Sequence, residues 1–306
     1  MRKNLIYFFI GIFLGFLFVF PIDFFQKSLE DFFYAQIGKP FEEIPLVEIK
    51  TPKRPPLNLD VESALSLKIF SSEREKILFK KNPEKILPIA SLTKLMTAVI
   101  AFENYDLYEE IEISKKAASQ QNVPNYGNLK EGEVFSVRKL LSLMLVYSSN
   151  DAAFALAEKM GVKKFVEKMN QKARGIGMKN TTFFNPTGLK DGGLNISTAE
   201  DLAKLVKYIL REKPEILRIS TEKTIYDAPH SIFEIKLPNN QKLIGGKTGF
   251  LPGSEIGNKN EGWGCMVFVF KNEKGILFLN IILGAKSSQE RIIQMQKLVD
   301  WINGKI

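Results

Sequence analysis

The sequence predicts an α+β (α/β) fold: an antiparallel sheet built from N-terminal and C-terminal strands, flanked by helices, with an all-helical subdomain inserted between them. Two observations support this prediction. Short apolar runs separated by polar turns, typical of strands in hairpins, occur near both ends of the region 58–306. Apolar residues at helical spacing, with capping signals, fill the region between them, roughly 105–225.

The first strands are expected to form a hairpin, with strands at 64–70 and 77–79 and a polar turn through Glu75. A helix is expected after Ser91, because apolar residues then recur three and four positions apart. Ser136 has the position of an N-cap before a second helix. The apolar residues of these two helices are Leu95, Met96, Val99, Ile100 and Phe102, then Leu140, Leu141, Met144 and Leu145.

The middle of the chain continues as helices. They are expected at 151–160, ended by Gly161, and at 162–174. The run Ser197-Thr198-Ala199-Glu200 opens another helix, which must end before Pro214 because proline cannot continue a helix interior.

The last third of the chain returns to strand patterns. A second hairpin is expected from strands at 263–270 and 276–283, followed by an amphipathic helix at 291–302. Cys265 lies in the first of these apolar runs and is expected to be a small core residue.

The composition excludes several classes of protein. The 43 Lys and Arg residues exceed the 34 Asp and Glu residues and give a formal charge of +9. These charges are spread along the chain, so no nucleic-acid partner is expected. One cysteine cannot form an intramolecular disulfide, and one histidine leaves too few ligands for a zinc site. We therefore expect no metal and no cofactor.

The N-terminal segment predicts the compartment. Residues 5–22 carry no charged side chain, and as a helix they would rise about 27 Å, close to the hydrocarbon thickness of a bilayer. Arg2 and Lys3 precede them and would stay in the cytoplasm by the positive-inside rule. A cleaved signal peptide is the alternative, but no small-x-small cleavage site follows. We expect a single-pass anchor in the cell membrane, with the catalytic domain extracytoplasmic.

Three segments follow from this interpretation. Residues 1–25 would form the cytoplasmic tip and the transmembrane anchor. Residues 26–57 would form a stem, which is extended because of its prolines. Residues 58–306 would form the catalytic domain.

Ser91 and Lys94 are the candidate nucleophile and base. His230, the single histidine, lies in a loop-like segment without a G-x-S-x-G elbow, so a lysine with a lowered pKa is the expected base. At the start of a helix, residues three apart share a face, which brings the Lys94 amine to the Ser91 hydroxyl. The helix dipole favours the developing alkoxide, and burial and neighbouring cations would lower the pKa of Lys94.

The Ser-x-x-Lys pattern is weak by itself, because it occurs three times in the chain. Ser136 with Lys139 is better explained by a helix cap, and Ser220 with Lys223 by a polar connection between a helix and a strand.

Two further motifs distinguish Ser91 from these matches. Ser148-Ser149-Asn150 lies in a break between two helices. Lys247-Thr248-Gly249 follows two glycines and opens an apolar stretch, as expected of an edge strand that a substrate backbone approaches. The three motifs, in this order, resemble the S-x-x-K, S-D-N and K-T-G signature of penicillin-binding proteins and class A β-lactamases.

The residues around these motifs resemble those of the D-alanyl-D-alanine carboxypeptidase family, the low-molecular-weight penicillin-binding proteins. The resemblance spans roughly 60–305. It implies a β-lactamase/transpeptidase-like fold and a serine DD-peptidase that removes the terminal D-alanine from peptidoglycan stem peptides in the cell wall. It also implies acylation by β-lactam antibiotics. The similar segments are 87–98, 148–153, 165–170, 177–178, 184–189 and 197–203.

The resemblance assigns the catalytic roles. Ser91 would attack the carbonyl of the penultimate D-alanine and form an acyl-enzyme, while Lys94 takes its proton. Ser148 would relay a proton to the leaving D-alanine. The backbone N–H groups of Ser91 and Phe250 would form the oxyanion hole.

The resemblance also assigns substrate binding. Asn150 would bond the stem-peptide backbone. Thr248 would contact the terminal carboxylate, whose negative charge Lys247 also attracts, and Lys247 would hold the electrostatics of the Ser148 proton relay. Gly249 and Phe250 complete the expected substrate-binding set.

One departure concerns the carboxylate. The resemblance implies an arginine between His230 and Gly246, and this chain has none there. Lys236 or Lys242 could substitute, although a point charge matches a carboxylate less well than a guanidinium fork.

Three alternatives remain at this point. A DD-endopeptidase that cuts peptidoglycan crosslinks would use the same catalytic residues. A class A β-lactamase would need a deacylating glutamate, but Glu167 fits a helix of the carboxypeptidase pattern instead. A non-catalytic wall-binding sensor is disfavoured because all the motif residues are present.

Overall fold

The computed structural model describes residues 27–29, 55–71, 74–120, 127–222, 231–257 and 261–305. The chain divides into two compact units, 1–53 and 54–306, and the elements below belong to the second. The expected anchor at 5–22 and nearly all of the expected stem lie outside the described residues. No helix within the described ranges is long and apolar enough to cross a membrane.

A five-stranded antiparallel sheet forms the centre of the 54–306 unit. Its strand order is β2-β1-β9-β8-β7. N-terminal and C-terminal strands therefore share one sheet, as the sequence predicts, and β1 joins β9 with Ser66 opposite Asn280. The strands are β1 Ser63–Ile69, β2 Glu75–Lys81, β7 Gln241–Leu251, β8 Trp263–Asn272 and β9 Leu277–Ala285.

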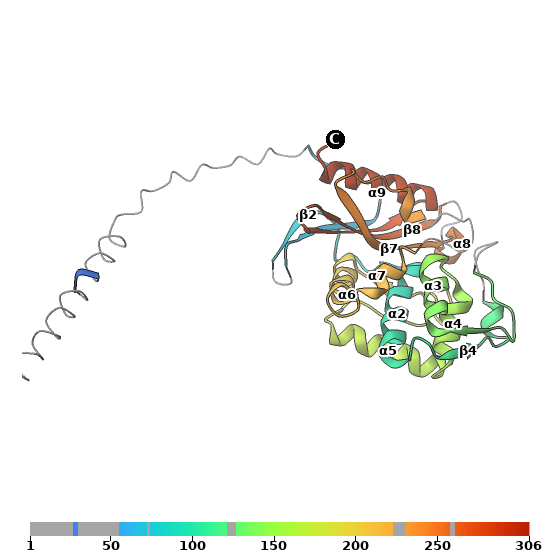
Figure 1. Ribbon diagram of the computed structural model, residues 1–306. Helices are drawn as coiled ribbons and strands as arrows, with labels where there is room; N and C mark the ends of the chain where they lie inside the picture. Colours follow the sequence, from blue (N-terminus) through green and yellow to red (C-terminus); the bar gives the residue numbers. More distant parts are fainter. Residues whose placement is uncertain are drawn as a thin grey trace, which may run out of the picture. The chain divides into compact units, whose positions relative to one another are not determined.

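Both faces of the sheet are covered, which explains the continuous apolar run of β8. Successive side chains of a strand point to opposite faces. Cys265, Val267 and Val269 belong to the core beneath α2 (Thr93–Asn104) and α6 (Ala199–Glu212), whereas the alternate residues face α9 (Ser288–Ile302). Figure 1 shows α9 on one side of the sheet and the remaining helices on the other. Cys265 is fully buried, which confirms its interpretation as a core residue.

The inserted region is mainly helical, with caps where the sequence places them. Ser136 accepts a hydrogen bond from the Lys139 backbone N–H, and Thr198 accepts one from that of Asp201. The helices here are α3 Val137–Val146, α4 Asn150–Glu158, α5 Val162–Gly175 and α7 Glu215–Ile219, besides α2 and α6.

The prediction of an all-helical insertion is wrong in one respect. β4 (Glu110–Glu112) pairs with β5 (Val134–Ser136) inside it. A second small ladder joins β3 (Leu87–Pro88) to β6 (Ile196–Ser197). Strands of two or three residues are too short to show a period in the sequence. The shorter helical turns are η1 Ala90–Leu92, η2 Ala117–Ser119, η3 Ser231–Glu234 and α8 Gly253–Ile256.

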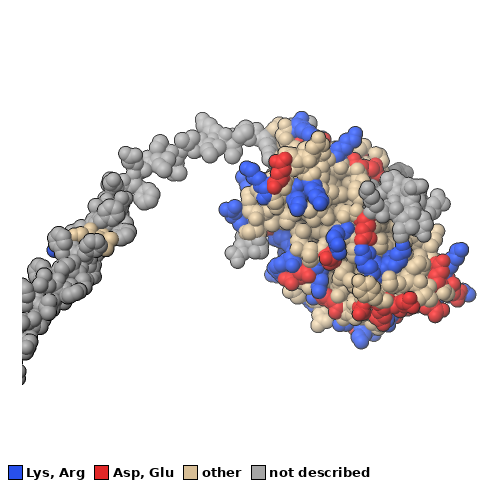
Figure 2. Space-filling view, in the orientation of Figure 1, with Lys and Arg blue, Asp and Glu red and all other residues tan. Residues whose placement is uncertain are grey.

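The surface carries charges of both signs. On the face in Figure 2, Lys and Arg side chains alternate with Asp and Glu side chains, although acidic groups gather along one lower margin.

Candidate active site

Ser91 lies where η1 leads into α2, in a strained turn. The residue before it, Ala90, has φ of 48°, a backbone region that side-chain-bearing residues rarely adopt. Gly188 packs against this turn so closely that a Cβ atom there would overlap the Ala90 carbonyl group. Surrounding structure therefore holds Ser91 in place, half-buried at the head of α2.

Lys94 is fully buried and reaches Ser91, as the spacing predicts. Its Nζ lies 3.0 Å from Ser91 Oγ, 2.6 Å from Asn150 Oδ1 and 2.6 Å from the Thr187 carbonyl oxygen. The last two oxygens are acceptors without a hydrogen of their own. A neutral amine that donates its two N–H bonds to them keeps its lone pair for the Ser91 hydroxyl proton.

The surroundings favour this neutral form. Burial, and secondly the positive charge of Lys247, hold the pKa of Lys94 well below its usual value. Lys94 can therefore accept a proton near neutral pH, where an exposed lysine could not.

Ser148 lies just beyond α3, in another unusual backbone conformation with φ of 62°. Its Oγ accepts a hydrogen bond of 3.0 Å from Lys247 Nζ. The next residue, Ser149, caps α4 by accepting from the Ala152 backbone N–H. The cap starts the helix at Asn150, whose side chain meets Lys94, so the second motif joins the first.

Lys247 is fully buried in β7, the edge strand that the sequence predicts. Besides Ser148, it donates to the Thr248 carbonyl oxygen at 2.8 Å. Burial, and then the nearby charge of Arg291, lower the pKa of Lys247 to about 7.

Gly249 and Phe250 bring β7 against the nucleophile. A Cβ atom at Gly249 would lie 3.0 Å from the Ser91 backbone nitrogen, so glycine permits the close approach. The next residue, Phe250, carries the backbone N–H that the resemblance assigns to the oxyanion hole together with that of Ser91. The Phe250 side chain is 40% exposed, whereas Thr248 is nearly buried.

Arg291 is a residue of the site that the sequence interpretation missed. It is 8% exposed on α9, and its Nη1 donates to the Gly249 carbonyl oxygen at 2.7 Å. A signal existed, because Arg291 shares the apolar stripe of its predicted helix with Met295 and Leu298. A charged residue on an apolar face is expected to have a buried partner.

The two suggested substitutes for an arginine lie elsewhere. Lys236 and Lys242 are both exposed. Lys242 pairs with Lys271 at the far end of β7, six residues from Thr248, a separation of about 20 Å along a strand.

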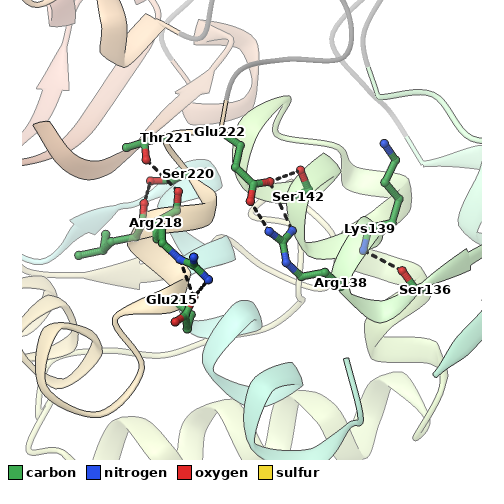
Figure 3. A network of polar contacts seen from close by, with 10 residues as sticks. Ser136, Arg138, Lys139, Ser142, Glu215, Arg218, Ser220, Thr221 and Glu222 are labelled. Carbon is green, nitrogen blue, oxygen red and sulfur yellow. Dashed lines mark hydrogen bonds and ion pairs between the residues drawn. The ribbon is translucent and has the colours of Figure 1, made fainter. Parts of the chain in front are cut away.

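Figure 3 shows why the other Ser-x-x-Lys matches differ from Ser91. Ser136 accepts a hydrogen bond from the backbone N–H of Lys139, at 3.2 Å, and the lysine side chain extends away from it. Ser220 is fully buried; it donates to the Leu217 carbonyl oxygen and accepts from the Gly246 N–H at 3.0 Å. It therefore attaches α7 to β7 one residue before Lys247.

His230 and Lys223 lie outside the described residues. Across the ranges that the structure describes, no three His, Cys, Asp or Glu side chains gather in a way that could hold a metal ion.

Comparisons with known proteins agree with the chemistry of this site. Residues 50–287 match the model of peptidase family S11, D-alanyl-D-alanine carboxypeptidase. The chain is 30% identical over 244 residues to the D-alanyl-D-alanine carboxypeptidase DacF of Bacillus subtilis, covering 78% of this chain and 61% of DacF. It is 35% identical over 217 residues to a D-alanyl-D-alanine endopeptidase of Pseudomonas aeruginosa, covering 69% of this chain and 68% of that protein.

Solved structures show the same fold. Penicillin-binding protein D2 of Listeria monocytogenes, in its cefotaxime-bound form, has a TM-score of 0.66 and 28% identity, covering 82% of this chain and 100% of that one. The chain spans about three fifths to two thirds of the length of the curated relatives named above. Because the family model matches well over half of its residues, the chain belongs to peptidase family S11, the D-alanyl-D-alanine carboxypeptidase family.

Proposed function

We propose that this protein is a serine DD-carboxypeptidase that removes the terminal D-alanine from peptidoglycan stem peptides. The observation that carries the proposal is the environment of Lys94. Two acceptor oxygens, on Asn150 and Thr187, take its N–H bonds and leave its lone pair for Ser91. This arrangement activates a serine through a lysine base.

The reaction then follows from the positions of the side chains. Ser91 Oγ attacks the carbonyl carbon of the penultimate D-alanine as its proton passes to Lys94 Nζ. The Ser91 and Phe250 N–H groups stabilise the oxyanion, each by a few kcal/mol. The proton passes through the Ser148 hydroxyl to the leaving nitrogen, and the C–N bond breaks. Water then attacks the acyl-enzyme, gives a proton to Lys94 and releases the shortened peptide, which restores the Ser91 hydroxyl.

The enzyme would recognise its substrate by the terminal carboxylate. Lys247 and Arg291 place two cations beside the Thr248–Gly249 segment of β7. An anionic group bound there would face the Thr248 hydroxyl. It would also stabilise the two buried cations by pairing with them. Arg291, which donates to the Gly249 carbonyl oxygen from α9, is our candidate for the guanidinium that the resemblance implies.

A DD-endopeptidase is the second candidate. It is favoured by one observation: the endopeptidase of P. aeruginosa is more similar in sequence to this chain than DacF is, at 35% against 30% identity. An endopeptidase would cut a crosslinked dimer with the same Ser91 acyl-enzyme.

The experiment that separates these activities offers the protein two substrates. A carboxypeptidase releases D-alanine from a stem pentapeptide, and an endopeptidase releases monomers from a crosslinked dimer. We expect D-alanine release from the pentapeptide, and Ser91→Ala should abolish it. Cleavage of the dimer without D-alanine release would replace the first proposal by the second, and no cleavage of either would refute both.

We further propose acylation by β-lactams and a membrane-tethered, extracytoplasmic location. The first is supported by similarity to penicillin-binding protein D2, which has been solved in cefotaxime-bound and ampicillin-bound forms. The second rests on the uncharged segment 5–22 and the basic residues before it. Protease accessibility of the domain in intact cells would test the location.

A further inference from the structure

A buried asparagine lies behind the Thr187 carbonyl group. Asn185 is 2% exposed, in the segment between α5 and β6. Its Oδ1 accepts from the Thr187 backbone N–H at 3.2 Å, the Thr187 hydroxyl at 3.1 Å and the Gly188 N–H at 2.8 Å. Its Nδ2 donates to the carbonyl oxygens of Leu189 at 2.8 Å and Asp191 at 3.0 Å. One side chain therefore fixes the backbone on both sides of residue 187.

The Gly188 contact has a specific geometric consequence. The Gly188 N–H and the Thr187 carbonyl belong to one peptide group, and in a planar trans peptide they point in opposite directions. Asn185 draws the N–H toward itself, so the carbonyl oxygen faces the other way, toward Lys94 Nζ at 2.6 Å. Hydrogen bonds linked in this way polarise one another.

The same arrangement is attached to the helix that carries Lys94. Asn195 Nδ2 donates to the Asn185 carbonyl oxygen and to Thr93 Oγ1, each at 2.9 Å. Its Oδ1 accepts from the backbone N–H of Phe184 at 2.7 Å. Thr93 directly precedes Lys94 on α2, so the amine and its carbonyl acceptor keep a fixed relation.

We propose that Asn185 is a positioning residue for the Lys94 base. By holding the Thr187–Gly188 peptide group, it fixes one N–H bond of Lys94 and thereby directs the remaining lone pair at Ser91. This inference rests on the proposed function, since it requires neutral Lys94 to take the Ser91 proton.

The charges around Lys94 set the direction of a pH effect. Lys247, from β7, is the charged group that acts on Lys94 among the described residues. From α4, Asn150 is neutral, and the adjacent Asp151 directs Oδ2 to the Leu129 N–H at 2.9 Å. A carbonyl oxygen stabilises an ammonium more than an amine. Loss of the oriented carbonyl should therefore lower the pKa of Lys94 further.

The test measures the acylation rate of the full-length protein by a fluorescent penicillin as a function of pH. Asn185→Ala should lower the maximal rate about 10- to 100-fold, because the carbonyl group that accepts a hydrogen bond from the base is no longer held in place. It should also move the acid limb of the profile to lower pH. A purely structural role would lower the rate or the stability without moving that limb.

A second variant covers the case in which Asn185→Ala does not fold. Thr187→Val keeps the shape of the side chain but removes one of the three donors that Asn185 accepts, together with the acceptor of the Leu189 N–H. It should move the acid limb in the same direction by a smaller amount. The matched control is Thr97→Val, because Thr97 Oγ1 donates at 2.7 Å to the Pro186 carbonyl, in the neighbouring peptide group. The pH–rate profile of that control should keep the acid limb of the wild-type protein.

Two outcomes would overturn the inference. One is a folded Asn185→Ala protein, or in its absence a folded Thr187→Val protein, whose acid limb matches the wild type. The other is an equal shift in Thr97→Val. Failure of the proposed function looks different, because the wild-type protein would then not be acylated at Ser91 at all.

Discussion

Two buried lysines define this site at the scale of single residues. Lys94 and Lys247 have no exposed surface, and the pKa of each is lowered by burial and by a neighbouring cation. The sequence predicts the pairing of Ser91 with Lys94, because residues three apart at the start of a helix share one face and can meet. It does not predict the Thr187 carbonyl acceptor, which any residue type could supply from its backbone. Arg291 was missed because it belongs to a helix far from the three motifs.

The pH dependence of acylation follows from these two lysines. Lys94 must be neutral to accept a proton, so the rate should rise with pH through its lowered pKa. Lys247 must stay charged to attract a carboxylate, so the rate should fall again above about 7, the pKa of Lys247 in the free protein. A bell-shaped profile of the second-order rate constant for a penicillin is therefore expected. A rate that keeps rising toward the ordinary lysine pKa would contradict the assignment of the base.

Removing a buried charge should stabilise the protein while destroying its activity. The folded-state pKa of Lys247 is about 7, against an ordinary value of 10.5. Below the folded-state pKa, Lys247 is protonated in both the folded and the unfolded protein. Burial of its charge then lowers the free energy of unfolding by the full amount. From there up to the unfolded value, this cost decreases as pH rises.

Lys247→Met should therefore raise the free energy of unfolding at neutral pH by on the order of 2 kcal/mol, and the gain should shrink in alkaline solution. Denaturant unfolding at several pH values measures this. A Lys247→Met protein less stable than the wild type at neutral pH would show that the hydrogen bonds of Lys247 outweigh its burial cost.

At the scale of elements, the site depends on close approaches between loops and strands. The segment containing Gly188 packs against the turn before Ser91, and β7 packs against the same turn at Gly249. The caps at Ser136 and Thr198 could be recognised from the sequence, because side chains mark them. The β3–β6 and β4–β5 pairs could not, since they form through tertiary contacts and not through a local pattern.

Gly188→Ala tests the first of these contacts. Its φ of 89° is unfavourable for alanine, and the added Cβ would overlap the Ala90 carbonyl group. We expect a loss of about 2–4 kcal/mol in the free energy of unfolding, from strain and displaced backbone. The control is Gly175→Ala at the exposed end of α5, where a Cβ meets nothing within 4 Å. Equal stability of the two variants would mean that the Ala90 turn adapts easily.

At the scale of the whole molecule, the sheet joins residues that are far apart in the chain. Ser63 lies opposite Leu283, so the hairpin near residue 70 completes a sheet whose other strands come from the last third. The sequence predicts this arrangement because strand patterns occur at both ends of the domain and helical patterns between them. The sequence predicts the N-terminal boundary of the domain less well, because the proline-rich segment before the domain has no periodic pattern.

The N-terminal boundary can be tested by truncation. Pro55 accepts a hydrogen bond from Trp301 Nε1 at 2.7 Å, and the Asp60 N–H donates to Gln294 at 2.9 Å, so residues 55–60 contact α9. Removal of residues 1–53 should leave penicillin labelling and thermal stability unchanged. Removal of residues 1–62 should lower the melting temperature, because buried Leu59 and Val61 leave the core. Loss of labelling in the shorter truncation would show that the first unit is needed for the second to fold.

The most direct measurement locates the nucleophile among the three Ser-x-x-Lys motifs. The protein is incubated with a fluorescent penicillin, digested, and the modified residue is found by mass spectrometry, with Ser91→Ala in parallel. We expect the label on Ser91, none on the peptides that contain Ser136 or Ser220, and none in the variant. A label on Ser136 or Ser220, or undiminished labelling of Ser91→Ala, would contradict the assignment of Ser91 and Lys94 as nucleophile and base.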